Sequence, residues 1–216
     1  MPNLRAIALA AFFACTCTVA AAQLPPEQEA LFRQMEGTLF VKDHTETVQG
    51  RLSACGLEFA ALTRDFSTKR GAPVKLVGSY YLRRFDGKPG VFYALKLGIF
   101  EGPRLAKPVA PHNAFVRAIT GEGPAIKAQR SDSDSPGFAL FLGEVDDSFL
   151  KVYSGILDEN LFVVGFNRKP GQMDVSAEID LSVQDTRLEG SQVNRDRSPR
   201  MVKQFVACAG SLANAR

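Results

Sequence analysis

The stretch PVKLVGSYYLRRFDGKPGVFYALKLGIFE, residues 73–101, decides the fold of this chain. Its turn, residues 85–90, contains Asp-Gly and Pro-Gly, which favour turn conformations and end strand pairing. Apolar side chains occupy every second position on one side of the two flanking segments: Val74, Leu76, Tyr80 and Leu82, then Val91, Tyr93, Leu95, Leu97 and Ile99. Period-two alternation is typical of strands with one buried face. The stretch therefore predicts a β-hairpin with a core packed against one side.

The other side of this predicted hairpin is rich in aromatic residues. It carries Val77, Tyr81, Phe85, Phe92 and Phe100 among the basic residues Lys75, Arg83 and Lys96. Such a face is either covered by a second layer or forms a cavity or a contact surface. We expect a second layer, because sandwiches and barrels both provide one. If the face is open instead, Tyr81, Phe85, Phe92 and Phe100 are the candidate ligand-binding residues.

Further short strands are predicted along the chain. Five apolar segments have the length and spacing of antiparallel strands: residues 38–42, 114–120, 138–145, 149–157 and 161–167. Residues 173–181 alternate most regularly, with these side chains inward and polar ones facing water: Met173, Val175, Ala177, Ile179 and Leu181. Residues 55–61 favour a strand with a bulge near Gly56, and a helix over residues 54–64 is the alternative.

Helices are expected at the two ends of the mature chain. Residues 27–36 follow two prolines and end before Gly37, which is typical helix punctuation. Near the C-terminus, Ser198 and Pro199 suit an N-cap and a first turn, and apolar residues then recur every three or four positions. The sequence thus predicts one mainly antiparallel β domain over residues 23–216, a sandwich or small barrel with a short helix at each end.

The turn at residues 85–90 has a near twin at residues 166–171. The two read Phe-Asp-Gly-Lys-Pro-Gly and Phe-Asn-Arg-Lys-Pro-Gly, and the same offset places Asp65 on Asp146. One explanation is duplication of a β unit, with the two copies packed about a pseudo-twofold axis. The other is convergence, because Lys-Pro-Gly suits a hairpin turn wherever one is needed. The sequence leaves both explanations open.

The first 22 residues have the pattern of a secretory signal peptide. Arg5 precedes an apolar run over residues 6–14, and Ala20 with Ala22 satisfies the A-x-A rule. We expect cleavage after Ala22 and a periplasmic or secreted protein; lipoprotein processing at Cys15 is the less favoured alternative. The apolar run is shorter than the roughly 20 residues that a membrane span needs, and no later segment comes close, so no transmembrane segment is expected.

Two cysteines remain in the predicted mature chain, Cys55 and Cys208. In an oxidising compartment an even pair is expected to form a disulfide. That bridge would fasten the predicted C-terminal helix to the segment that contains Cys55. A reactive thiol would be expected in a Cys-x-x-Cys motif or near a histidine, and neither arrangement is visible in the sequence.

Charge and motifs argue against several classes of function. The formal net charge is +3 and acids and bases are interspersed, so nothing indicates nucleic-acid binding. No metal or cofactor is expected, because the chain lacks paired histidine or cysteine ligands and a nucleotide-binding loop. Asp132 and Asp134 begin like a calcium loop, but Pro136 and Gly143 occupy two of the later ligand positions.

Three functions remain open. The lack of a catalytic motif, together with a braced scaffold, favours a non-enzymatic binding or scaffold protein of the bacterial envelope, with another envelope protein as its partner. The first alternative is a carrier of a small apolar ligand inside an aromatic-lined β cavity. The second is a hydrolase that uses His112, which lies in a proline-flanked loop where catalytic residues often occur. The oligomeric state cannot be read from the sequence.

Overall fold

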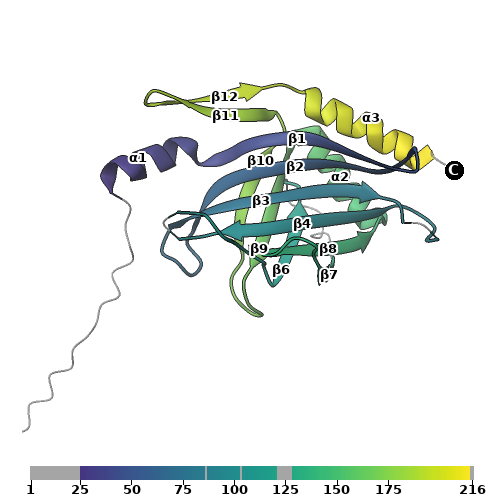
Figure 1. Cartoon of the computed structure of the whole chain (residues 1–216), viewed down its shortest axis with the longest axis horizontal. Coiled ribbons are helices and arrows are strands. Elements are labelled where there is room, and N and C mark those ends of the chain that lie inside the picture. The colour runs from purple at the N-terminus through teal and green to yellow at the C-terminus, as the bar shows by residue number, and fades with distance from the viewer. Residues whose placement is uncertain (1–24, 86, 103, 121–127, 215–216) are drawn as a thin grey trace, which may run out of the picture.

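A large antiparallel sheet of seven strands forms the front layer of the computed structural model (Figure 1). The structure describes residues 25–85, 87–102, 104–120 and 128–214. The strands follow the order β1-β2-β3-β4-β8-β7, and β5 pairs with β4 beside them. Their bounds are β1 Gly37–Val48, β2 Arg51–Asp65, β3 Ala72–Arg83, β4 Phe92–Phe100, β5 Pro108–Val109, β7 Gln129–Asp132 and β8 Phe138–Glu144.

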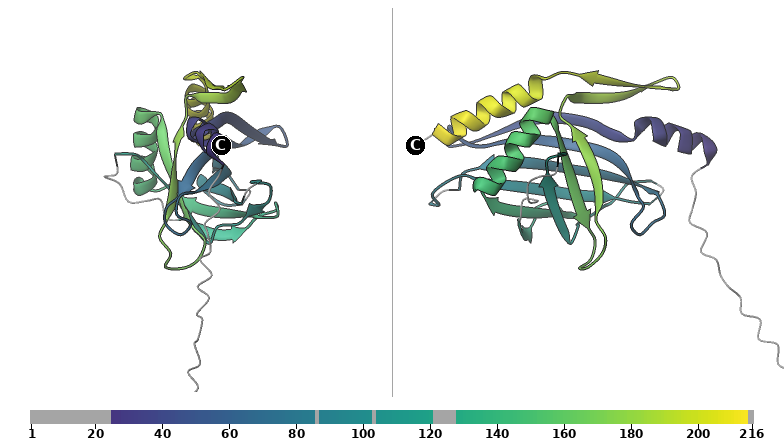
Figure 2. Two further views of the ribbon diagram at one scale, coloured as in Figure 1. Left: turned by 90° about the vertical axis from the view of Figure 1, so that its left-hand side faces the viewer. Right: turned by 180° about the vertical axis from the view of Figure 1, so that it is seen from behind.

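A second layer packs on one face of this sheet. It is a three-stranded antiparallel sheet in the order β10-β9-β6, with helix α2 beside it on the same face of the large sheet (Figure 2). Its elements are β6 Asn113–Arg117, α2 Asp147–Glu159, β9 Leu161–Asn167 and β10 Val175–Asp180. The sheets do not close on themselves, so the architecture is a sandwich. The predicted antiparallel β fold is confirmed.

Helices lie at both ends of the described chain, as predicted. They are α1, Pro26–Met35, and α3, Arg200–Asn214. Before α3 the chain forms a hairpin of β11, Val183–Glu189, and β12, Gln192–Arg197, which runs beside β1 (Figure 1). The sequence analysis did not anticipate this hairpin. Val183 is its one fully buried apolar side chain among the described residues, so the strands lack the alternation that reveals a buried face.

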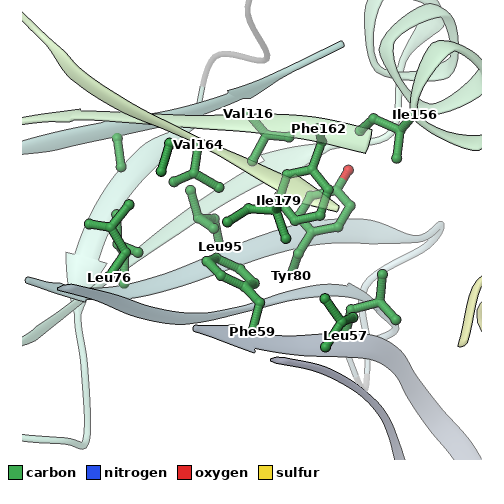
Figure 3. Packing of buried hydrophobic residues seen from close by; sticks show 14 of the residues in the cluster. Leu57, Phe59, Leu76, Tyr80, Leu95, Val116, Ile156, Phe162, Val164 and Ile179 are labelled. Atoms are coloured by element: carbon green, nitrogen blue, oxygen red, sulfur yellow. The ribbon is translucent and has the colours of Figure 1, made fainter. Parts of the chain in front are cut away.

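The central hairpin buries the side that its sequence pattern predicted. Tyr80 of β3 lies opposite Leu95 of β4, and each is at most 2% exposed. The Tyr80 ring centre is 6.1 Å from that of Phe162 in β9, and Phe59 of β2 meets the same Phe162 ring edge-on at 5.5 Å (Figure 3). Aromatic side chains from both sheets thus fill the space between the layers.

Residues 149–157, predicted as a strand, belong to helix α2 instead. Asp146 caps this helix, because its carboxylate accepts a hydrogen bond of 2.8 Å from the Phe149 amide. The buried side chains Phe149, Val152 and Ile156 follow helical spacing and not a period of two. The sequence interpretation was wrong because a short apolar run fits both patterns until its cap is recognised.

Residues 51–65 form the predicted strand, and its irregularity lies near Gly56 but not at it. The pairing of β2 with β3 runs without a shift through Gly56 and Tyr81, whereas the pairing with β1 skips Ser53 between Glu46–Ala54 and Thr47–Leu52. Gly56 is needed for another reason. A Cβ at this position would come within 2.1 Å of the Tyr81 ring, which lies directly over the glycine.

The two similar turns both occur in hairpins, but the elements around them differ. The first joins β3 to β4, and the second joins β9 to β10. Before the first turn the chain passes from β2 into β3, whereas helix α2 stands between β8 and β9 before the second. Asp65 ends a strand, and its counterpart Asp146 caps a helix. The likeness of the turns therefore does not extend to a repeated order of elements.

The predicted disulfide joins Cys55 of β2 to Cys208 of α3, with 5.7 Å between the two Cα atoms. Cys55 is fully buried on the inner side of the large sheet. Phe205 and Leu212 of α3 are buried on the same side of the helix as Cys208. The bridge consequently fixes the C-terminal helix against the inner side of β2.

Replacing both cysteines, as Cys55→Ala with Cys208→Ser, should lower the free energy of unfolding by roughly 2–5 kcal/mol. The bridge restricts the unfolded chain over a long loop, whereas the apolar side of α3 still packs in the variant. Urea denaturation monitored by circular dichroism measures this loss. Chemical reduction of the unmutated protein should produce a shift of similar size, and equal midpoints before and after reduction would contradict the prediction.

A buried carboxylate, Asp65 at the end of β2, joins three loops at one end of the sandwich. The side chain is fully buried and accepts hydrogen bonds from the amides and hydroxyls of Ser67 and Thr68. Arg168, in the β9–β10 turn, approaches Asp65 with Nη2 at 2.9 Å from Oδ2 and also pairs with Glu101 after β4. The two sheets are therefore linked by one arginine between two carboxylates.

The free energy of unfolding should depend on pH through the protonation of Asp65. Burial alone would raise the pKa of this carboxyl group, but the hydrogen bonds from Ser67 and Thr68 and the charge of Arg168 outweigh burial and lower the pKa to about 2, from an ordinary value of 3.8. Because the pKa of Asp65 is lower in the folded state than in the unfolded state, the ionised carboxylate stabilises the folded state fully at pH values above the unfolded pKa. This contribution disappears as the pH falls towards 2.

The variant Asp65→Asn should therefore be less stable than the parent protein by about 2 kcal/mol at neutral pH. This difference should shrink between about pH 4 and pH 2, where the parent protein loses the same contribution. Urea midpoints across that range test the prediction. Asp174→Asn, a change at an exposed neighbour, is the control, and a difference for Asp65→Asn that stays constant with pH would refute the proposed linkage.

Candidate functional site

The outer face of the seven-stranded sheet is the most distinctive surface of the molecule. We define it by the outward side chains of β1, β2, β3, β4 and β8. No described element covers it, because the second sheet, α2 and α3 all pack on the inner side (Figures 1 and 2). The expectation of a second layer over this side of the central hairpin is therefore wrong. The second layer is needed on the inner face, where the alternating strands place most of their apolar surface.

Strand register gathers large apolar side chains on the outer face. Val77, Tyr81, Phe92 and Phe100 alternate with the core residues of β3 and β4, and β8 adds Phe138, Leu140 and Leu142 beside them. Each of these seven side chains is half-buried. They cover one another and the backbone, yet retain apolar surface towards solvent.

Glycines let two of these rings lie flat on the sheet. Gly98 of β4 is opposite Phe138 of β8, and a Cβ on Gly98 would come within 2.7 Å of the Phe138 ring. Gly56 has the same relation to Tyr81, as described above. Each ring therefore lies in the space that a side chain on the glycine would fill. This contact fixes the orientation of the ring and keeps it close to the backbone of the sheet.

Basic side chains lie against the aromatic rings of this face. The Lys75 ammonium is 5.6 Å from the centre of Phe100, that of Lys96 is 5.8 Å from Phe138, and that of Lys88 is 5.9 Å from Phe92. The guanidinium of Arg83 is likewise 5.6 Å from the Phe85 ring centre. Each contact is worth about 0.5–1 kcal/mol at an exposed site. The outer face thus combines apolar surface with positive charge.

A polar cluster occupies the β1–β2–β3 side of the outer face. His44 lies edge-on to Tyr81 with 5.4 Å between ring centres, and its two ring nitrogens are 3.2 Å and 3.4 Å from carboxylate oxygens of Glu58 and Glu46. Glu46 also pairs with Arg83 at 3.1 Å. Burial raises the pKa of the Tyr81 hydroxyl, and the nearby carboxylates of Glu58 and Glu46 add to that rise. Tyr81 is therefore a neutral hydrogen-bonding group.

The four sequence-predicted ligand residues all lie on or beside the outer face, but in separate places. Phe85 and Phe92 meet edge-on at 5.5 Å near the β3–β4 turn. Phe100 lies at the opposite end of β4 against Phe138, at 6.3 Å, and Tyr81 faces β1 through His44. They form a strip across an open surface and not the lining of a pocket.

Sequence reasoning missed the contributions of β1 and β8 to this face. The alternation of Phe138, Leu140 and Leu142 was visible, because residues 138–145 were predicted as a strand. Its position beside β4 was not, since pairing between distant strands leaves no local signal. The meeting of His44 with Glu58 has no local signal for the same reason, because the pairing of β1 with β2 brings the two residues together.

Two shallow surface hollows lie away from the outer face. One, of about 380 Å³, is bordered by Asn160, Asp180 and Arg197, and the other, of about 330 Å³, lies between Gly37, Arg117 and Glu178. Within the described chain no group of three or more histidine, cysteine or acidic side chains could hold a metal ion. Neither hollow has the enclosed aromatic lining that a carrier of apolar ligands would use.

His112, the residue of the hydrolase alternative, lies in the segment between β5 and β6. Its side chain is exposed, and its backbone amide donates a hydrogen bond of 2.9 Å to the Asn167 carbonyl. In the part of the chain that the structure describes, its imidazole makes no hydrogen bond to a serine or a carboxylate. The geometry thus does not assemble a nucleophile and a base around it.

Comparisons of the chain with protein-family models, with curated proteins and with solved structures gave no match. No described helix is both long enough and apolar enough to cross a membrane. The function must consequently be argued from the surface itself.

The close approach of Tyr81 to Gly56 predicts a cost for any side chain at Gly56. Gly56→Ala should reduce the free energy of unfolding by about 1–3 kcal/mol, because the Tyr81 ring and the Tyr80 carbonyl both stand within 3 Å of the new methyl group. Gly210→Ala in α3 is the matched control, since nothing lies within 4 Å there and alanine favours a helix. Chemical denaturation distinguishes the two variants, and equal stability would contradict the predicted clash.

Proposed function

We propose that this protein is a non-enzymatic binding protein of the bacterial envelope, and that the outer face of its large sheet binds a partner protein. The observation that carries the proposal is an uncovered sheet face on which half-buried aromatic and aliphatic side chains are interleaved with lysine and arginine. Aromatic residues and arginine are enriched where proteins bind one another. The signal-peptide pattern and the disulfide support a location outside the cytoplasm.

The charge of the face indicates the chemistry of the partner. Lys42, Lys75, Arg83, Lys88 and Lys96 supply five positive charges, and they are spread along the strip of aromatic side chains. Some of this charge is already balanced. Lys96 pairs with Asp134 at 2.8 Å, and Arg83 pairs with Glu46. A partner with an apolar patch bordered by carboxylates would complement the remainder.

A protein partner accounts for the surface better than a carried ligand does. The space between the two sheets is occupied by buried side chains such as Phe59, Tyr80 and Phe162 (Figure 3). The aromatic residues predicted to line a cavity lie on the open outer face instead. A flat, rigid strip of this kind suits a second protein surface, whereas small ligands need concave sites that enclose them.

Site-specific photocrosslinking in the native host tests this proposal. A benzoylphenylalanine placed at Phe92 or Phe138 should give one discrete covalent adduct, whereas the same group at Leu150 of α2 should not. Leu150 is a fair control because it is an exposed apolar residue away from the outer face. Mass spectrometry of the adduct then identifies the partner protein.

Charge reversal on the outer face provides the second measurement. Lys75→Glu together with Lys96→Glu should weaken binding of the identified partner about tenfold or more, while Lys151→Glu on α2 should leave it unchanged. Affinity can be measured by titration with the purified partner. Adducts of equal yield from Phe92 and Leu150, or affinity that is insensitive to the Lys75 and Lys96 changes, would refute the outer face as the binding surface.

A further inference from the structure

Two neighbouring turns at one end of the sandwich each expose a large apolar side chain. Phe66 begins the β2–β3 turn and is 76% exposed. Met173, predicted from the sequence to face inward, precedes β10 instead and is 73% exposed. These are the two most exposed large hydrophobic side chains of the described residues. Both turns lie at the same lower end of the molecule in two views (Figures 1 and 2). We call the two turns, residues 66–71 and 168–174, the apical tip.

The apical tip is held together by ion pairs around the buried Asp65 carboxylate. Arg168 of one turn forms an ion pair with Asp65, and its Nη1 donates a hydrogen bond to the Thr68 hydroxyl at the base of the other turn. Glu101 pairs with both Arg168 and Lys69. Because both turns share this support, Phe66 and Met173 are presented by a fixed structure and not by independent loops.

Local geometry keeps Phe66 exposed at the tip. Gly71 has a φ of +84°, and a Cβ there would lie 2.8 Å from the Phe66 ring, so the ring rests on the glycine of its own turn. No other described aromatic ring packs against Phe66. The ring therefore remains available for contact with another phase or molecule.

Each of the two turns also carries an unpaired cation. Arg70 adjoins Gly71 and Lys169 adjoins Arg168, and both are exposed. Neither forms an ion pair with another described residue. The acids close by are mostly engaged, because Asp65 and Glu101 bind Arg168, and Asp174 accepts a hydrogen bond from Asn167. Exposed apolar side chains accompanied by unpaired cations are complementary to the interface of an anionic bilayer, where apolar groups enter below the lipid phosphates.

We propose that the apical tip docks on an anionic lipid surface, with Phe66 and Met173 inserted at the headgroup level and Arg70 and Lys169 on lipid phosphates. This surface is separate from the outer sheet face, so the proposal stands independently of the partner protein proposed above. Docking by the tip would leave the outer face directed sideways from the bilayer and accessible to a second protein.

Lipid vesicles test the tip directly. The full mature chain should sediment with vesicles of phosphatidylcholine and phosphatidylglycerol, bind far less to pure phosphatidylcholine, and dissociate as the salt concentration rises. Phe66→Ser with Met173→Ser should weaken binding to the anionic vesicles about tenfold or more. Arg70→Ala with Lys169→Ala should weaken it about twenty-five-fold, at roughly fivefold for each cation near the surface.

Matched changes on α2 are the controls. Leu150→Ser and Lys151→Ala remove an exposed apolar side chain and an exposed cation from another part of the surface, and each should leave vesicle binding unchanged. Circular dichroism checks that every variant is folded. Equal binding to neutral and anionic vesicles, no binding to either, or full binding by the Phe66 and Met173 double variant would overturn the proposal.

A spectroscopic variant gives an independent readout of insertion. The chain contains no tryptophan, so Phe66→Trp introduces a single indole at the tip. Its emission should shift to shorter wavelength when anionic vesicles are added, because the ring leaves water for the acyl boundary. Leu150→Trp should show no shift. Unchanged emission from Phe66→Trp under conditions in which the protein sediments with vesicles would place the contact elsewhere and refute the tip.

Discussion

Burial of one face of the large sheet is the constraint on which the rest of the structure depends. Strands β2, β3 and β4 carry alternating apolar residues, and Tyr80 at the centre of that face is almost completely removed from water. The side chains of β9 and α2 meet this ring and its neighbours through Phe162 and Phe149. Hydrophobic burial of this extent supplies the main driving force for folding, and it determines which face the second layer must cover.

The uncovered face follows from the same arrangement. A chain with one second layer can cover only one side of a seven-stranded sheet, so the aromatic residues opposite the core remain at the surface. They bury part of themselves by lying on glycines and under lysine side chains, as Phe138 does between Gly98 and Lys96. Such contacts lower the cost of exposing an aromatic ring but do not remove it from solvent. The surface that results is rigid, apolar and positively charged.

Two covalent or ionic links hold the peripheral parts to this sandwich. The disulfide from Cys55 to Cys208 fixes α3 to the inner side of β2. Arg168 joins the far end of the second sheet to Asp65 and Glu101 of the first. The cost of burying the Asp65 carboxylate is offset by hydrogen bonds from Ser67 and Thr68 and by the charge of Arg168. The turns at that end can therefore expose Phe66 and Met173 without loosening the fold.

The sequence by itself determined the central hairpin, the β class, the helices at the two ends and the disulfide. Period-two alternation and capping residues are visible within short stretches of sequence, and the disulfide follows from the even number of cysteines. It also placed Tyr81, Phe85, Phe92 and Phe100 on the side of the central hairpin opposite the core. Only the tertiary structure decided that α2 is a helix, capped by Asp146, and that β8 lies beside β4. It also decided that His44 faces Glu58 and that no second layer covers the outer face. Strand order, sheet packing and the meeting of Asp65 with Arg168 depend on contacts between residues far apart in the chain, for which local patterns carry no signal.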